Sequence, residues 1–174
     1  MAVDPRLLMS PQFAEHLWLT SASNGNTSYF INKKGADYSD AVWEGGGMKM
    51  GGSEQRIVKN ILDAVSGTDI LNFKQTKDRR YSQWDIKKVN GWGDSTAGVA
   101  ESPSWGWDIY FRDEIGKKLS RFEYQLIHHE IGHSIGLSHP GERPTNPAYS
   151  QADTVMSYNV VVDRNGNEVP YGFT

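Results

Sequence analysis

One short stretch, HHEIGHSIGLSHP (His128–Pro140), holds four of the five histidines in this chain of 174 residues. The residues before it predict where a helix begins, because Ser120 and Glu123 fit the S-x-x-E capping box, whose side chains satisfy free amides of the first helical turn. Gly136 is placed to end that helix in a left-handed turn, and Pro140 prevents the helix from resuming. The pattern therefore predicts a helix that begins just after Ser120 and carries histidines near its C-terminal end.

The spacing of the histidines predicts which of them share a ligand. His129 and His133 lie one turn apart on the predicted helix, with Cβ atoms about 5–6 Å apart on one face. Two imidazoles at this separation can bind one ion at the ~2.0–2.1 Å of a zinc–nitrogen bond. His139 follows just past the turn and can return to the same ion as a third ligand. His128 points about 100° away around the helix, so we interpret it as a surface or neighbouring-layer residue.

Glu130 stands beside the first of these ligands and completes an H-E-x-x-H motif. Its carboxylate is positioned to accept a proton from a water molecule that the metal has acidified to a pKa of about 7. A lone histidine on an apolar face is often an ordinary core residue. A chance match at five fixed positions, the three of this motif together with Gly136 and His139, has a probability of about 10⁻⁴ over such a chain, however. The motif therefore favours a metal-dependent hydrolase.

Composition excludes several other classes of protein. The chain has no cysteine, so any metal is held by nitrogen and oxygen. It has 18 basic and 21 acidic residues and no basic run, which argues against a nucleic-acid partner or a basic membrane face. The first residues contain no apolar run of the ~7–15 residues that a signal peptide needs, and no segment approaches the ~18 that span a bilayer. We expect a single soluble domain over residues 1–174, without a visible N-terminal export signal.

The rest of the chain alternates between strand-like and helix-like patterns. Ser28–Asn32 is predicted to be a strand, and Gly45–Gly52 a surface loop. An amphipathic helix is predicted to follow, with Ser53 as its N-cap and Gly67 at its end. Four further strands are predicted at Ile70–Phe73, Trp84–Val89, Thr96–Glu101 and Trp107–Phe111. Strands with one helix early and another late predict an α+β fold, in which a mixed sheet packs against helices.

The segment His129–His139 resembles the metzincin metalloproteases, because it fits their zinc signature H-E-x-x-H-x-x-G-x-x-H. Thr154–Tyr158 (TVMSY) resembles the Met-turn of that family, with Met156 as its methionine. Pro140 directly after the third histidine, and Ser-Tyr directly after the methionine, resemble the serralysin branch of bacterial secreted proteases. A thermolysin-like site would take its third ligand from a glutamate on a following helix. The prolines that follow the histidines leave no room for such a helix.

The resemblance assigns a role to each residue of the site. It implies that His129, His133 and His139 are zinc ligands and that Glu130 is the general base. It implies that Tyr158 is a movable fifth ligand whose hydroxyl turns toward the oxyanion. Two other interpretations stay open: Met156 as an ordinary core methionine, and Tyr158 as a buried tyrosine with a hydrogen-bonded hydroxyl.

The resemblance also implies a metzincin, or zincin-like, fold. A twisted mixed five-stranded sheet and two main helices would form an upper subdomain, about 1–136, above the zinc cleft. An irregular lower subdomain with the Met-turn would span about 137–174. In that fold the edge strand beside the cleft pairs with the extended substrate, as unpaired edges commonly do. The residues expected there are Thr96, Ala97, Gly98, Val99, Ala100 and Glu101. The alternative is an edge strand without this role.

The C-terminal end departs from the serralysin pattern. Serralysins continue past the Met-turn into a helix and then into glycine-rich calcium-binding repeats that also carry the export signal. This sequence ends at PYGFT, so we expect either truncation before the C-terminal helix or a minimal relative. Asp163, Asn165 and Asn167 have the spacing of a calcium loop, but its distal acid is missing. Asn165-Gly166 is a strong hairpin-turn signal, and we favour the turn.

These patterns lead to the expectation of a zinc-dependent endopeptidase, secreted and monomeric by resemblance, that acts on protein or peptide substrates. A non-catalytic zinc-binding module is one alternative, and a zinc hydrolase of non-peptide substrates is another. Three histidine ligands leave one coordination position open, whereas structural zinc sites are usually closed by four protein ligands. Glu130 beside an open position favours catalysis.

Overall fold

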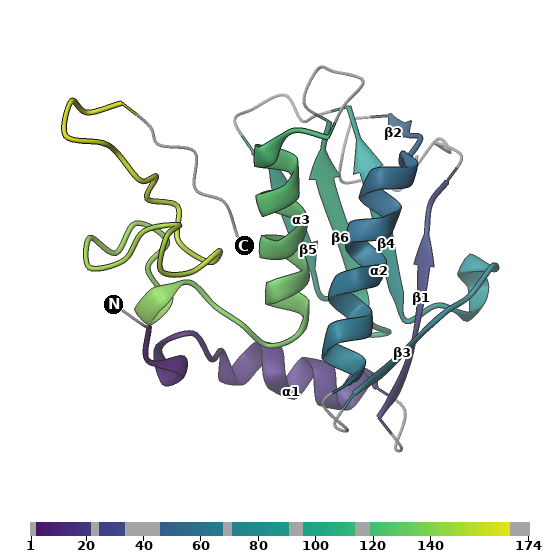
Figure 1. Cartoon of the computed structure of the whole chain (residues 1–174). Helices are drawn as coiled ribbons and strands as arrows, with labels where there is room; N and C mark the ends of the chain where they lie inside the picture. The colour runs from purple at the N-terminus through teal and green to yellow at the C-terminus, as the bar shows by residue number, and fades with distance from the viewer. Residues whose placement is uncertain are drawn as a thin grey trace.

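The computed structural model describes residues 3–21, 25–33, 46–67, 71–90, 96–113 and 119–167 of the chain. Two helices, α2 and α3, cover one face of a mixed β-sheet, and a third helix, α1, runs crosswise near the C-terminal end of α3 (Figure 1). The helices are α1 (Pro11–Thr20), α2 (Gly52–Ser66) and α3 (Arg121–Ser134). The strands are β1 (Asn26–Ile31), β2 (Gly47–Met48), β3 (Asn72–Gln75), β4 (Trp84–Val89), β5 (Gly98–Glu101) and β6 (Trp107–Arg112). The α+β class expected from the sequence is confirmed.

The strand order in the sheet is β3-β1-β4-β6-β5. The pairs β3–β1, β1–β4 and β4–β6 are parallel, and β5 runs antiparallel to β6. The short strand β2 pairs antiparallel with the last two residues of β4, Lys88 and Val89, beyond the part of β4 that pairs with β1. Within the described ranges, β5 is therefore the terminal strand on its side of the sheet.

The expected number of elements was wrong in two places. Over the described ranges the sheet has six strands rather than five, because β2 lies within the glycine-rich segment that we interpreted as a surface loop; Gly45 itself is outside these ranges. The described part of the chain has three α-helices rather than two, because α1 was not predicted. Ser10 caps α1 through a hydrogen bond from the Phe13 amide to its hydroxyl, and Pro11 occupies its first turn. These are ordinary helix-start signals.

The other helices and strands lie close to their predicted positions. The capping box of α3 is confirmed at Ser120 and Glu123, and the predicted bounds of β4 match. The N-cap of α2 is Gly51 rather than Ser53, because the carboxylate of Glu54 accepts the Gly51 amide and starts the helix earlier. The predicted strand at residues 70–73 is observed at 72–75, and Ile70 lies outside the described residues.

The core lies between the sheet and the two covering helices. Val58 and Leu62 of α2 and Ile127 and Ile131 of α3 are almost completely buried. They pack against a large apolar face of the sheet in a single cluster, which fixes α3 firmly on the sheet. The strand residues of that face are Tyr29, Ile31, Phe73, Trp84, Ile86, Trp107, Ile109 and Phe111.

A buried lysine links the N-termini of the two covering helices. The ammonium group of Lys88 on β4 binds the carboxylates of Glu54 and Asp113 and lies 3.7 Å from a carboxylate oxygen of Glu123. Glu54 and Glu123 are the third residues of α2 and α3, and their carboxylates accept the amides of the N-cap residues. Burial alone would lower the pKa of Lys88, but hydrogen bonds to Asp113 and Glu54 outweigh it and raise that pKa. The lysine thus fixes where both helices start relative to the sheet.

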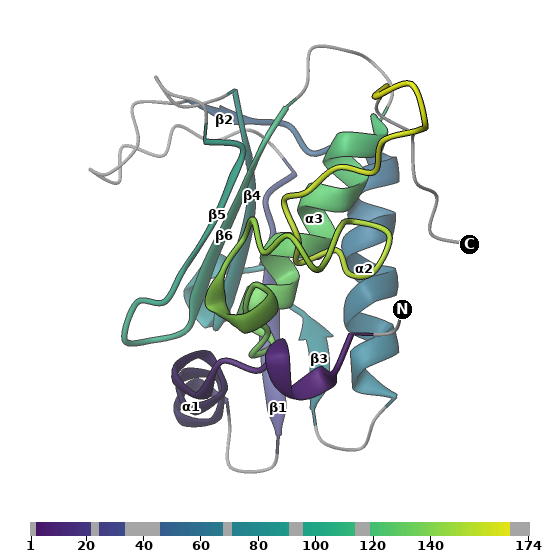
Figure 2. The same cartoon turned by 90° about the vertical axis from the view of Figure 1, so that its left-hand side faces the viewer.

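The chain after α3 is irregular. Between residues 135 and 167 it contains turns and one short 3₁₀ segment at Pro140–Glu142, and it lies beside α3 (Figures 1 and 2). Of the described helices, none has the length and apolar character needed to cross a bilayer. The proposed division into upper and lower subdomains stays a prediction.

Candidate metal centre

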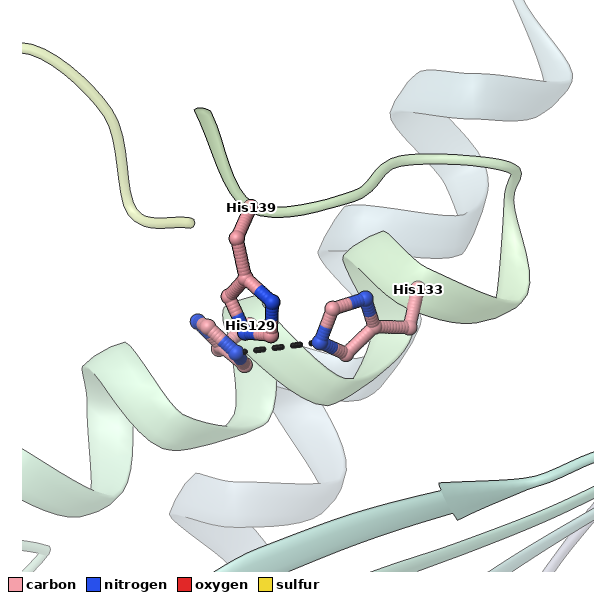
Figure 3. Close-up of side chains that lie close together, drawn as sticks. All are labelled: His129, His133 and His139. Atoms are coloured by element: carbon pink, nitrogen blue, oxygen red, sulfur yellow. Dashed lines mark hydrogen bonds between the residues drawn. The ribbon is translucent and has the colours of Figure 1, made fainter. Parts of the chain in front are cut away.

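Three histidines meet beside the C-terminal half of α3. His129 and His133 come from the helix, and His139 comes from the segment that follows it (Figure 3). One ring nitrogen from each lies within 4.8 Å of one from each of the others. His129 and His133 lie on one helix face because they are one turn apart, as the sequence predicted.

A tight turn at Gly136 returns the chain toward the helix. Gly136 has φ +98, a left-handed conformation that favours glycine, and the Leu137 amide donates to the carbonyl of Gly132 at 2.9 Å. The turn also lies close to α1, since a Cβ at Gly136 would lie 3.4 Å from the Cα of Ala14. Gly136 therefore directs the chain so that His139 lies near the two helical histidines.

The N-terminal segment holds this turn in place. The Ser10 amide donates to the Gly136 carbonyl at 2.9 Å, and the Ser138 amide donates to the Leu8 carbonyl at 2.6 Å. Met9 and Leu137 form an antiparallel bridge between these bonds. The segment Leu8–Ser10 is therefore part of the framework that positions His139.

Backbone carbonyls orient two of the rings. Nδ1 of His129 donates to the carbonyl of Val155 at 2.9 Å, and Nδ1 of His133 donates to the carbonyl of Leu137 at 2.9 Å. Because a carbonyl can only accept, each neutral ring carries its proton on Nδ1 and presents the lone pair of Nε2. The two Nε2 atoms lie 3.1 Å apart (Figure 3). Proteins commonly hold metal-binding histidines through such contacts of the second ring nitrogen.

The residues present fit a bound metal ion. Nε2 of His139 is buried and has no hydrogen-bond partner among the described residues, and a buried polar atom in that state costs about 1–3 kcal/mol. Burial, reinforced by neighbouring histidines, lowers the pKa of His129 and of His139 to about 4. Burial also lowers the pKa of His133. The rings are therefore neutral at neutral pH, which is the form that binds a metal.

Glu130 lies next to His129 on α3 and is only 4% exposed. Its carboxylate reaches the edge strand β5, where it lies against Gly98. Burial raises the pKa of Glu130 to about 8. A divalent cation held by the neighbouring histidines would favour the ionised form and lower this pKa again. Glu130 is thus a buried carboxyl group beside the histidine cluster, which becomes a proton acceptor once it is ionised.

The TVMSY segment lies close to the cluster. Val155 supplies the carbonyl that orients His129, and Met156 is completely buried against Gly132 of α3. The ring of Tyr158 is 54% exposed, with its centroid 5.2 Å from that of His129 and 5.0 Å from that of His139. Burial of the hydroxyl and the charge of Glu130 raise the pKa of Tyr158, so the hydroxyl keeps its proton.

The structure brings together most of the residues that the sequence singled out. His128, as expected, is not part of the cluster: its Nδ1 donates to the Tyr124 carbonyl at 2.8 Å, and its ring contacts the tilted ring of Tyr124, with centroids 4.3 Å apart. The predicted edge strand is shorter than expected, because Thr96 and Ala97 precede β5.

The proposed calcium loop forms a turn. The Asp163 carboxylate accepts hydrogen bonds from the amides of Asn165 and Asn167, and Gly166 has φ +81. The turn interpretation is confirmed, and a calcium ion at these residues stays a prediction.

One contact of the site was missed from the sequence. The ring of Phe13 on α1 meets that of His133 edge-on, with centroids 5.5 Å apart, and meets Trp107 in the same way at 5.7 Å. Phe13 therefore supports the ring of His133 from α1. The Ser-Pro start signal at residues 10–11 could have revealed the helix, but nothing in the sequence indicates which ring Phe13 contacts.

Comparison with known proteins adds no relative to this description. No family model matches the sequence, and no curated protein matches it either. The chemistry of the clustered side chains is therefore the basis for a functional proposal.

Proposed function

We propose that this protein is a zinc-dependent endopeptidase of the metzincin type, similar to the serralysins. His129, His133 and His139 would hold the zinc, and Glu130 would act as general base. The observation that carries the proposal is the convergence of three neutral imidazoles beside a buried carboxylate; one imidazole has a buried Nε2 without a partner in the part of the chain that the structure describes. By the same resemblance we expect a secreted, monomeric enzyme.

Bound zinc would supply a Lewis acid that polarises the substrate carbonyl and makes water more acidic. Glu130 would take a proton from the attacking water and later deliver it to the leaving amine. Burial raises the proton affinity of Glu130, and a cation held by the histidines would keep the carboxylate ionised, so that it can accept the proton from water. The protonated hydroxyl of Tyr158 would donate a hydrogen bond to the developing oxyanion.

The edge strand supports a peptide as the substrate. On one side β5 pairs with β6, and in the described part of the chain no strand pairs with its other side. An extended peptide can add to such an edge through backbone hydrogen bonds, largely independently of its side chains. Because Glu130 lies against Gly98 of this strand, a peptide paired there would pass the general base.

A cleavage assay tests this proposal. Casein or gelatin is incubated with the wild type and with Glu130→Gln, with and without a zinc chelator. We expect chelator-sensitive cleavage that falls by about 10²–10⁴-fold in Glu130→Gln. Glu15→Gln, at an exposed glutamate of α1, is the matched control and should keep full activity.

Three results would overturn the proposal. If Glu130→Gln keeps full chelator-sensitive activity, Glu130 is not the general base. If the wild type binds about one zinc ion per chain but cleaves neither protein, a non-catalytic zinc-binding module becomes the better explanation. Hydrolysis of small esters without proteolysis would instead favour a hydrolase of non-peptide substrates.

A further inference from the structure

The carboxylate of Glu130 occupies the place where a side chain at Gly98 would begin. A Cβ built on Gly98 would lie 2.5 Å from Oε1 of Glu130, 2.7 Å from Cγ and 2.8 Å from Cδ. Non-bonded carbon atoms pack at about 3.5–4.0 Å, so these distances leave no room for even a methyl group. The end of the Glu130 side chain therefore lies directly against the backbone of the edge strand.

The two sides of this contact are both held in place. Gly98 pairs with Phe111 across the ladder between β5 and β6, and the Arg112 amide donates to the Ala97 carbonyl at 2.8 Å just before it. Glu130 is on α3, whose neighbouring residues Ile127 and Ile131 are almost fully buried in the core. An added side chain at Gly98 would consequently move the carboxylate rather than the strand or the helix.

The backbone does not require glycine at this position. Gly98 is not among the glycines with positive φ, so alanine can adopt its conformation. Glycine inside a strand is less stable than alanine by roughly 0.5–1 kcal/mol. A missing side chain here thus lowers strand stability, and the close contact that requires it, among the described residues, is with the Glu130 side chain.

We propose that Gly98 is a positioning residue, which sets the place of the Glu130 carboxylate between α3 and the edge strand. The effect on catalysis rests on the proposed peptidase function, whereas the contact itself does not. A side chain at residue 98 displaces the general base from its place beside the histidine cluster. A displacement of about 1 Å in a catalytic group can reduce a rate by about 10²-fold.

The test compares the full-length chains of the wild type, Gly98→Ala, Glu130→Ala and the double variant Gly98→Ala/Glu130→Ala. Thermal unfolding is measured as purified and after chelation. We expect Gly98→Ala to lower Tm by about 5 °C when Glu130 is present. In the Glu130→Ala background the same change should leave Tm unchanged or raise it, because the clash is gone and the strand gains a better residue. Gly46→Ala, where a Cβ would have no neighbour closer than 4.0 Å, is the matched control.

Activity supplies a second readout. We expect Gly98→Ala to lower kcat by about 10–100-fold while KM changes by less than about twofold, because the base moves but the edge that would bind the peptide remains. The zinc content per chain should equal that of the wild type. A variant that merely unfolds would lose zinc and kcat together.

The outcomes separate the two proposals. An unchanged Tm and kcat in Gly98→Ala, or an equal loss of Tm with and without Glu130, overturns the role of Gly98. If Gly98→Ala does not fold but the double variant does, the contact is supported. If the wild type cleaves no peptide but Tm still shows the dependence on Glu130, the peptidase proposal fails and the positioning role of Gly98 stands.

Discussion

Met156 lies directly against Gly132: a Cβ on Gly132 would be 2.6 Å from the sulfur of Met156. Met156 is completely buried, and the carbonyl of the preceding Val155 accepts the hydrogen bond that orients His129. Gly132 stands between the motif residues Glu130 and His133 on α3. The segment Thr154–Tyr158 can therefore approach α3 closely because residue 132 has no side chain. This close approach brings the Val155 carbonyl to His129.

Gly132→Ala should lower the stability of the zinc-free chain by about 1–3 kcal/mol, because a methyl group would be forced into the Met156 side chain. Alanine is otherwise the better helix residue by about 1 kcal/mol. Gly52→Ala is the matched control, since a Cβ at this helical glycine has no neighbour within 4 Å and should stabilise α2 slightly. Urea unfolding measures the free energy of unfolding of both variants. Equal effects at the two glycines would show that Met156 does not restrict residue 132.

Phe13→Leu should weaken zinc binding by about tenfold, because the ring that packs against His133 is lost. The free energy of unfolding should fall by about 1 kcal/mol, the usual value of an aromatic contact with some lost burial. Competition with a zinc indicator measures the affinity. Phe122→Leu on α3, whose ring is partly exposed, serves for comparison and should leave the affinity unchanged. Wild-type affinity in Phe13→Leu would contradict the supporting role of α1.

Glu130→Gln should change how the stability of the zinc-free protein depends on pH. Burial raises the pKa of Glu130 to about 8 from its ordinary value of 4.5. A raised folded-state pKa contributes stability that is complete below pH 4.5 and is lost as the pH rises through 8. The wild type should therefore lose stability relative to Glu130→Gln across this window. Thermal unfolding at pH 5, 6.5 and 8 in the presence of chelator measures the difference, and parallel curves would contradict the raised pKa.

Lys88→Met should destabilise the protein by about 3–5 kcal/mol, because it leaves buried carboxylates of Glu54 and Glu123 without their shared cation. Lys74→Met, at an exposed lysine of β3, should change stability by less than about 0.5 kcal/mol. The pKa of Lys88 is raised above 10.5, so its contribution is complete below that pH and is lost as the pH rises through the folded-state pKa. Denaturant unfolding at pH 8 and pH 11 should show the larger difference at pH 8.

Acid should release the zinc at an unusually low pH. Protons compete with the metal for the ring nitrogens, and a lower pKa means that a ring stays neutral to a lower pH. Because the pKa values of His129 and His139 are about 4, we expect zinc to be retained at pH 6 and lost toward pH 4. Residual zinc after dialysis at each pH measures this. His128→Gln, outside the cluster, should release zinc at the same pH, and complete release from the wild type already at pH 6 would contradict the prediction.

Features set by neighbours in the sequence were predictable. The start of α3 follows from Ser120 and Glu123, which are three residues apart, and the grouping of His129 with His133 follows from helical periodicity. The return of His139 to this pair follows from the glycine turn between them. The proposed roles of these residues stay predictions until zinc and cleavage are measured.

Features set by distant parts of the chain were not predictable in this way. The pairing of β2 with β4 needs only two residues of strand, which is too short for a periodic pattern. The contact between Gly98 and Glu130 joins a strand to a helix and leaves no signal around either residue. The same holds for the Phe13 ring against His133. Such contacts depend on how the helices and strands pack, and the sequence around one residue does not indicate which distant residue it will contact.

The hydrogen bonds between Leu8–Ser10 and Gly136–Ser138 have a consequence for how the protein folds. Residues 11–135, most of the chain, lie between these two segments, so closing this loop carries a large entropy cost that local contacts do not share. Short-range interactions alone can form helix α3 and place His129 and His133 on one face of it. The third histidine reaches its final place only when the two distant segments meet. High-affinity zinc binding should therefore develop late in refolding, after most helical structure has formed.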